Sequence, residues 1–143
     1  MKYHNGCWLF KEGIGCFSPQ HVYETKVGDR EVVLCAPTAR IEKKGDTLGG
    51  INLTLRITAP MPEVIRVQTY HYKGVFKKAP EFELNLPGDQ KLDVIEEAGK
   101  IIIKNGHLSL VINKEHWSMS YERDGKLFTK RGAKYLYYLK KEC

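Results

Sequence analysis

No apolar run in this sequence reaches the roughly 20 residues that a membrane-spanning helix needs. The first six residues, Met1 to Gly6, are mostly polar and lack the apolar stretch of a secretory signal. We therefore expect a cytoplasmic protein with no membrane partner.

Cysteine is scarce, and the four cysteines, at positions 7, 16, 35 and 143, show no CxxC spacing. The five histidines lie in separate segments, and none of them has HxH or HxxxH spacing. The sequence thus gives no support to a zinc site or any other metal site. We expect Cys7, Cys16 and Cys35 to be small buried residues without disulfide bonds, and Cys143 to be exposed.

Motifs of catalysis are missing as well. There is no GxSxG nucleophile elbow and no GxxxxGK[ST] or GxGxxG phosphate loop, so no cofactor is expected. Sugar hydrolysis needs two carboxylates about 5–10 Å apart. Glu81 and Glu83 face the same side of an extended segment, but with Phe82 between them they are typical of a solvated face. No residue is therefore assigned a catalytic role.

The net charge of +6 raises the possibility of nucleic-acid binding. Basic residues gather between Lys126 and Lys141, where Tyr135, Tyr137 and Tyr138 could stack on bases. Acidic residues are interspersed with the basic ones along the chain, which favours a solvated strand face with the aromatic residues turned inward. A single-stranded nucleic-acid-binding domain is kept as an alternative, but we expect no nucleic-acid partner.

Strand patterns, in contrast, run along the whole chain. Residues 51–59 alternate between apolar and polar, with Ile51, Leu53, Leu55, Ile57 and Ala59 on one face. Turn signals at Gly28-Asp29, Asn105-Gly106 and Asp124-Gly125 predict hairpins, and residues 43–50 predict a flexible connection. Further strands are expected at 7–10, 20–27, 30–36, 64–72, 92–95, 101–103, 108–112, 117–121, 127–128 and 135–139.

This pattern predicts an all-β fold, an antiparallel β-sandwich, in a single domain over residues 1–143. The densest aromatic and polar cluster is Tyr70-His71-Tyr72. Tyr70, Tyr72 and Trp117 are the candidates for a platform that would bind a sugar. The alternative is that Tyr70 and Tyr72 cover a sheet face, as in any sandwich. In the predicted strand 117–121, Trp117, Met119 and Tyr121 lie on one face.

Over nearly its whole length, and less clearly after about Lys130, the chain resembles the N-terminal domain of bacterial α-xylosidases, in family 31 of the glycoside hydrolases. The resemblance is carried by residues 65–74 and 78–85, by Asn5-Gly6-Cys7-Trp8-Leu9 (the family's "NG-x-WL") and by Ser18 to Glu24 ("SP-x-x-V-Y/F-E/D"). Ala36-Pro37, residues 45–48, 106–110 and 117–121 agree in order and spacing.

The resemblance implies a sandwich like that of galactose mutarotase, packed on a catalytic (β/α)₈ barrel of the same polypeptide. The barrel would hold both catalytic aspartates and hydrolyse an α-xyloside or α-glucoside with retention, so this chain alone would be inactive. The resemblance also implies an exposed apolar patch for the barrel, including residues of 135–139. A stand-alone carbohydrate-binding module is the main alternative, and a homo-oligomer is possible.

Overall fold

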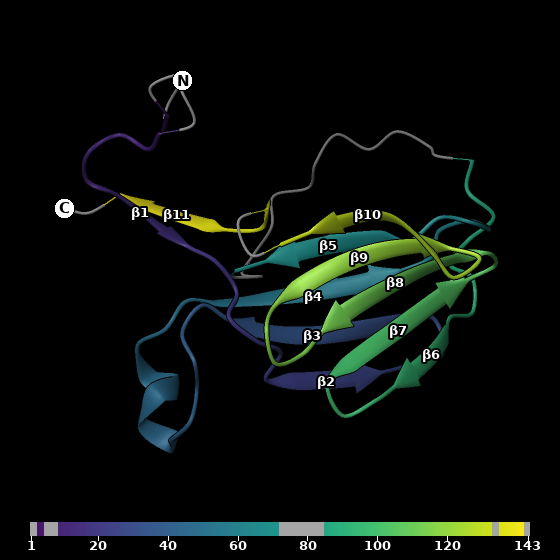
Figure 1. Cartoon of the computed structure of the whole chain (residues 1–143), viewed down its shortest axis with the longest axis horizontal. Helices are drawn as coiled ribbons and strands as arrows, with labels where there is room; N and C mark the ends of the chain where they lie inside the picture. Colours follow the sequence, from purple (N-terminus) through teal and green to yellow (C-terminus); the bar gives the residue numbers. More distant parts are fainter. Residues whose placement is uncertain (1–2, 5–8, 72–84, 133–134, 142–143) are drawn as a thin grey trace.

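The computed structural model describes residues 3–4, 9–71, 85–132 and 135–141. Two antiparallel β-sheets pack face to face, and a two-stranded ribbon extends from one end of them (Figure 1). This arrangement confirms the predicted all-β sandwich. The part of the predicted strand 7–10 that covers residues 7 and 8 lies outside the described residues, and Phe10 forms only an isolated bridge with His4.

The four-stranded sheet has the order β2-β3-β4-β5. Its strands are β2 (Glu24–Val27), β3 (Glu31–Pro37), β4 (Asn52–Thr58) and β5 (Arg66–Tyr70). The alternation predicted for residues 51–59 is confirmed, because Leu53, Leu55 and Ile57 all point into the core. The strand predicted from residue 20 begins only at Glu24.

The five-stranded sheet has the order β10-β9-β8-β7-β6. Its strands are β6 (Asp93–Glu96), β7 (Lys100–Asn105), β8 (Leu108–Asn113), β9 (Ser118–Arg123) and β10 (Lys126–Arg131). Every connection in this sheet joins neighbouring strands, as in a β-meander. Strand β10 is an edge strand whose six residues are all exposed.

The ribbon pairs β1 (Ile14–Phe17) with β11 (Tyr138–Lys141). The sequence did not predict a strand at β1, and the strand predicted at 135–139 begins only at Tyr138. Two-stranded ribbons are marginally stable alone in water. Leu136 and Tyr138 pack against the main core and thereby hold the ribbon to the sandwich.

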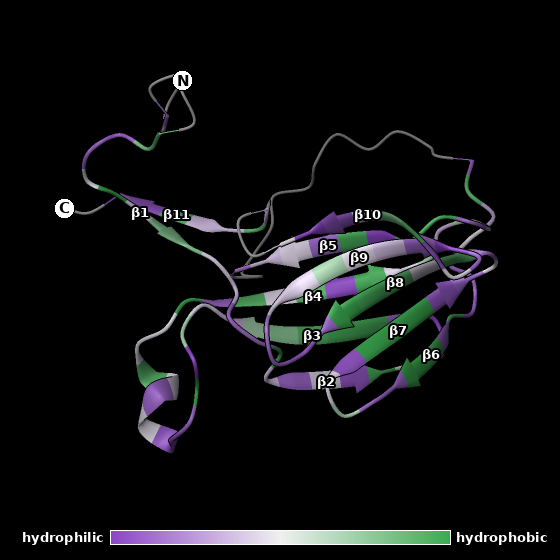
Figure 2. Cartoon of the chain, viewed as in Figure 1, coloured by the Kyte–Doolittle hydropathy of each residue, from purple (hydrophilic) through white to green (hydrophobic). Residues whose placement is uncertain are grey.

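The core lies between the two sheets, and Figure 2 shows hydrophobic segments in green along the strands of both sheets. It is built from aliphatic side chains of both sheets, and each side chain buried in this way contributes about 1.5–3 kcal/mol. The large ones that are fully buried are Val32, Leu34, Leu55, Ile57, Ile101, Ile103, Leu110 and Ile112.

Two of the three predicted hairpin turns are displaced by one residue. In the first, the Gly28 N–H donates to the Glu31 carbonyl at 2.8 Å, so Asp29 and Arg30 form the tip. In the second, Asn105 pairs with Leu108, so the turn is formed by residues 106 and 107. The turn at Asp124-Gly125 is confirmed, and both residues have positive φ angles, 50° and 75°, as a type I′ turn requires.

The connection between β3 and β4 contains a short 3₁₀ helix, η1 (Lys44–Leu48), where a flexible segment was expected. The Asp46 carboxylate accepts hydrogen bonds from the backbone N–H groups of Glu42 and Lys43, at 3.0 and 2.8 Å. These two bonds lower the pKa of the Asp46 carboxyl group. Within the described ranges, no helix combines the length and apolar composition that a bilayer crossing requires.

The prediction of buried cysteines is wrong for Cys16, which is exposed on the ribbon. The two-stranded ribbon extends beyond the two packed sheets (Figure 1), and in β1 Cys16 is exposed while Ile14, Gly15 and Phe17 are half-buried. Cys35 is half-buried on β3 and lies 3.0 Å from the side-chain nitrogen of Asn52. Cys7 and Cys143 lie outside the described residues.

Candidate functional site

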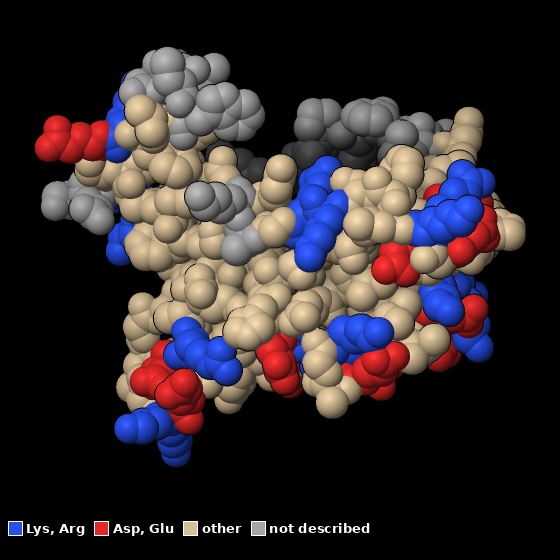
Figure 3. All heavy atoms as spheres, viewed as in Figure 1, with Lys and Arg blue, Asp and Glu red and all other residues tan. Residues whose placement is uncertain are grey.

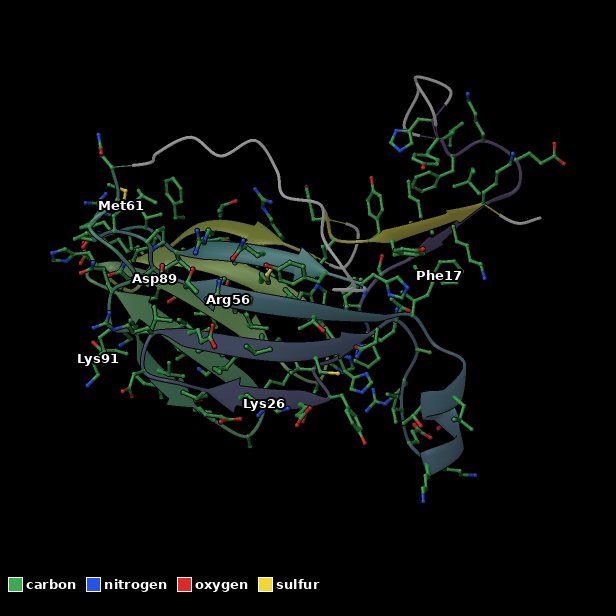
Figure 4. The ribbon with its side chains drawn as sticks, turned by 180° about the vertical axis from the view of Figure 1, so that it is seen from behind. Phe17, Lys26, Arg56, Met61, Asp89 and Lys91 are labelled. Carbon is green, nitrogen blue, oxygen red and sulfur yellow. The ribbon has the colours of Figure 1, made fainter. Side chains whose placement is uncertain are left out.

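The outer face of the four-stranded sheet carries a hollow of about 390 Å³, which lies across strands β3, β4 and β5. Figure 4 views the molecule from behind and so turns this face toward the reader, with Arg56 near its middle, Asp89 close to Arg56 and Lys26 farther away on β2. The hollow is lined by Glu31, Val33, Thr54, Arg56, Tyr70 and His71.

Strand alternation places these side chains on the outside. Leu53, Leu55 and Ile57 of β4 point into the core, so Thr54 and Arg56 between them point outward. The strand register then sets their neighbours, because Arg56 pairs with Val33 of β3 and Thr54 pairs with Tyr70 of β5.

An ion pair forms one wall of the hollow. The Arg56 Nε donates to the Glu31 Oε2 at 2.6 Å, and the Arg56 Nη1 donates to the Gln68 Oε1 at 3.4 Å. The hydrogen bond with the Glu31 carboxylate raises the pKa of the Arg56 guanidinium, although partial burial opposes this rise. Arg56 is therefore a permanent cation whose orientation is set by two neighbours.

A second ion pair lies beside the first, between the Arg66 Nη2 and the Asp89 Oδ1 at 3.6 Å. The Arg66 Nε also donates to the Thr58 Oγ1 at 3.0 Å. A second, more open hollow of about 600 Å³ adjoins here, sharing Glu31 and Arg56 with the first. The negative charges of Glu31 and Asp89 are thus paired with the positive charges of Arg56 and Arg66 on this face.

Tyr70 and His71 complete the rim. The His71 Nδ1 lies 3.2 Å from the Asn52 carbonyl oxygen, which fixes Nδ1 as the protonated nitrogen when the imidazole is neutral. The His71 ring also contacts the ring of Tyr138, with centroids 4.5 Å apart. His71 therefore links the four-stranded sheet to the ribbon.

Of the three aromatic residues proposed as a sugar platform, the structure describes two, and it places them on different sides of a sheet. Tyr70 lines the hollow, and Tyr72 lies outside the described residues, as do Glu81 and Glu83. Trp117 is only 5% exposed and belongs to the core, so its ring has no open face for a sugar. As predicted for residues 117–121, Trp117 shares a buried face with Met119.

Sequence reasoning missed Glu31, Thr54 and Arg56 as residues of one site. A signal was present, since Thr54 and Arg56 are the outward positions of the clearest alternating strand. No local signal links them to Glu31. The Glu31 carboxylate lies beside them only because β3 pairs with β4, and this pairing cannot be read from either strand alone.

The described residues that line the hollow offer groups that can bind a ligand. The Glu31 carboxylate is held by Arg56, and none of these lining residues is a cysteine or a serine. In the part of the chain that is described, no three His, Cys, Asp or Glu residues gather as metal ligands would. The hollow instead offers hydrogen-bond donors and acceptors beside an aromatic ring.

Residues 54–141 match the glycosyl hydrolase 31 N-terminal galactose mutarotase-like domain. The chain belongs to this family. The match runs from Thr54 in β4 to the end of β11, and so includes the whole five-stranded sheet and four of the six residues that line the hollow.

Curated relatives of the domain are α-xylosidases. The chain is 27% identical to α-xylosidase XylQ of Lactiplantibacillus pentosus over 94% of its own length and 18% of that enzyme. It is 31% identical to an α-xylosidase of Emericella nidulans over 79% of its length and 14% of that enzyme. The chain therefore spans less than a fifth of each relative.

Solved structures agree on the fold. An uncharacterised protein of Listeria monocytogenes superposes with a TM-score of 0.66 at 17% identity, over 90% of this chain and 11% of that one. The cycloalternan-forming enzyme of Listeria monocytogenes, solved with a pentasaccharide substrate, superposes with a TM-score of 0.65, again at 17% identity and with the same coverage.

Proposed function

We propose that this domain is the non-catalytic N-terminal part of a larger retaining glycosidase that acts on α-xylosides or α-glucosides. The observation that carries this proposal is the family match, together with the finding that the chain covers only 18% and 14% of the length of two α-xylosidases. Hydrolysis would proceed on a catalytic barrel of the same polypeptide by double displacement. The domain would buttress that barrel and wall one side of the substrate cleft.

Exposed apolar side chains near the ribbon support a contact with such a barrel. Tyr135 is 68% exposed and Tyr137 is partly exposed, and the Tyr137 ring lies edge-on to the ring of Phe10 at 5.7 Å. Exposed apolar groups of this kind are typical of surfaces that another body covers.

The outer face of the five-stranded sheet carries a second apolar feature. Ile95, Ile102 and Val111 are direct neighbours across β6, β7 and β8, and they point away from the core. Figure 3 views this side and shows Lys and Arg beside Asp and Glu toward its lower and right-hand margins. An aliphatic row of this kind favours a protein partner over a nucleic acid.

The proposed compartment is the cytoplasm, where thiols stay reduced. Cys16 and Cys35 are free thiols, and Cys16 is exposed to solvent. A reducing compartment would protect such a thiol from oxidation.

The test is to express the complete reading frame of the source gene and, separately, residues 1–143. Both proteins are assayed with p-nitrophenyl α-D-xylopyranoside and with p-nitrophenyl α-D-glucopyranoside. We expect the longer protein to release p-nitrophenol with one or both substrates, and the 143-residue chain to be inactive. Hydrolysis by the short chain, or a reading frame that ends without a catalytic domain, would contradict the proposal.

The contact surface is tested in the same two proteins with Tyr137→Ser and with the control Phe128→Ser, which changes an exposed ring on β10. We expect Tyr137→Ser to lower the melting temperature of the longer protein more than that of the short chain. An equal change in both proteins would mean that no barrel covers Tyr137.

A further inference from the structure

We propose that the hollow between Glu31, Arg56 and Tyr70 is a binding site for a neutral pyranoside sugar. This site would bind the sugar in the 143-residue chain itself, without a barrel. The inference therefore goes beyond the proposed function and does not depend on it.

The charge of the hollow favours a neutral ligand. Glu31 and Arg56 are joined at 2.6 Å and cancel each other, and Arg66 and Asp89 do the same next to them. An anion that approached Arg56 would meet the Glu31 carboxylate, and a cation that approached Glu31 would meet the guanidinium. A ligand with hydroxyl groups meets no such opposition.

The polar groups of the hollow match adjacent hydroxyls. The guanidinium of Arg56 has five N–H donors, and its hydrogen bonds to Glu31 and Gln68 engage two of them. The Glu31 carboxylate has further lone pairs, and the Thr54 hydroxyl both donates and accepts. Each hydroxyl of a sugar also donates and accepts, so neighbouring hydroxyls can pair with a donor and an acceptor held side by side.

The apolar lining matches the other surface of a sugar. A pyranose ring presents C–H groups as well as hydroxyls, and the Tyr70 ring and the Val33 side chain line the same hollow. Tyrosine suits such a ligand, because its ring is apolar and its hydroxyl group is polar. The volume of about 390 Å³ lies within the range of small-molecule sites.

The site is held in shape before any ligand arrives. Its side chains stand on three hydrogen-bonded strands, and Arg56 is oriented from two sides. His71 is fixed by the Asn52 carbonyl and the Tyr138 ring. A ligand therefore has to order few side chains, which favours binding even of a small sugar.

The experiment is a titration of the ¹⁵N-labelled 143-residue chain with methyl α-D-xylopyranoside and methyl α-D-glucopyranoside, followed by NMR. We expect backbone shifts that saturate with a Kd on the order of 1 mM and that centre on β3, β4 and β5. Because the ligand is neutral, we expect the Kd to stay constant between low and high salt. Absence of saturable shifts, shifts centred elsewhere, or a Kd that rises steeply with salt would overturn the proposal.

Three variants locate the ligand. We expect Tyr70→Ala to weaken binding at least tenfold, and Thr54→Val, which removes a hydroxyl at nearly constant volume, to weaken it several-fold. The control Phe128→Ala removes an aromatic ring that is 77% exposed on the other sheet, and it should leave the Kd unchanged. Should Tyr70→Ala fail to fold, two separate variants decide in its place. Tyr70→Phe keeps the aromatic ring and should bind the sugar like the parent chain, whereas Thr54→Val should bind it more weakly. Equal affinity of Thr54→Val and the parent chain would contradict the site.

Failure here and failure of the proposed function can be told apart. A chain that binds no sugar overturns this site but leaves open hydrolysis by the longer protein. A longer protein without hydrolytic activity overturns the proposed function but leaves the titration of the short chain unaffected.

Discussion

The side-chain amide of Asn105 donates a hydrogen bond to the backbone carbonyl of Met61 at 2.8 Å, and so joins the two sheets of the sandwich. The same nitrogen lies 2.9 Å from the Val64 carbonyl. Asn105 ends β7 and is buried, while Met61 and Val64 lie in the loop between β4 and β5. One polar side chain therefore satisfies two carbonyls of the opposite sheet.

Replacing this amide should destabilise the domain. We expect Asn105→Ala to lower the free energy of unfolding by about 2–3 kcal/mol, because two hydrogen bonds are lost and the Val64 carbonyl loses this donor. The Met61 carbonyl keeps the hydrogen bond from the Val64 N–H at 3.3 Å. Urea denaturation measures the change. Asn85→Ala, at an exposed position, serves as the control and should cost less than about 0.5 kcal/mol. Equal costs for the two variants would mean that Asn105 does not join the sheets.

Gly106 is confined by its backbone and by a neighbour. Its φ angle is 63°, and a Cβ added there would collide with the Glu63 carboxylate, which accepts the His107 N–H at 2.8 Å. We expect Gly106→Ala to cost about 2 kcal/mol or more, of which about 1–2 kcal/mol is the left-handed backbone. In a Glu63→Ala background the collision is gone, so only the backbone cost should remain.

A double-mutant cycle in urea measures this difference. Gly45→Ala provides the control, since a Cβ there meets no atom of the described chain within 4 Å and the φ angle is not positive. A cost of Gly106→Ala that is the same with and without Glu63 would show that the carboxylate does not fill this space.

Local patterns predicted the strand faces well. The alternation at residues 51–59 assigned Leu53, Leu55 and Ile57 to the core, because burial on one side of a sheet imposes a period of two. The turn at Asp124-Gly125 was also predictable, since few residue pairs tolerate two positive φ angles.

Features that depend on distant partners were not predictable. Asn105-Gly106 has the strongest local turn signal, yet Asn105 lies in β7 because its amide bonds to a loop of the other sheet. Strand β1 has a weak pattern of its own and exists through pairing with β11 from the far end of the chain. The candidate site is similar, since Glu31 and Arg56 are 25 residues apart.

Trp117 should behave as a core residue. We expect Trp117→Ala to cost about 3–5 kcal/mol, as for other large buried side chains. Its Nε1–H is buried without a hydrogen-bond partner in the described residues, which is itself unfavourable. Trp117→Phe removes this group, so it should cost no more than about 1.5 kcal/mol.

Thermal and urea unfolding measure the stability of both Trp117 variants, and Phe128→Ala, at an exposed position, serves as the control. Trp117→Phe should also bind methyl α-D-xylopyranoside like the parent chain, because the ring does not line the hollow. A selective loss of sugar binding in a stable Trp117→Phe protein would return this residue to the list of platform candidates.

His21 should make the domain less stable in mild acid. Burial, and then the positive charge of Arg40, lower the pKa of the His21 imidazole below its usual value of 6.5. The unfolded chain therefore binds a proton at a higher pH than the folded chain does, so stability rises with pH through this range. The buried Nδ1 of His21 has no hydrogen-bond partner among the described residues, which agrees with a neutral ring.

We expect the free energy of unfolding to fall as the pH drops through about 6.5, and to level off below the pKa of the folded state. Urea unfolding between about pH 7.5 and pH 5 measures this slope, which includes the carboxyl groups as well. His21→Asn removes the imidazole, so its slope should be smaller than that of the parent chain. His116→Asn, at an exposed position, should keep the parent slope. If His21→Asn and the parent chain lose stability in parallel, protons taken up elsewhere account for the acid sensitivity, and the burial of His21 has no part in it.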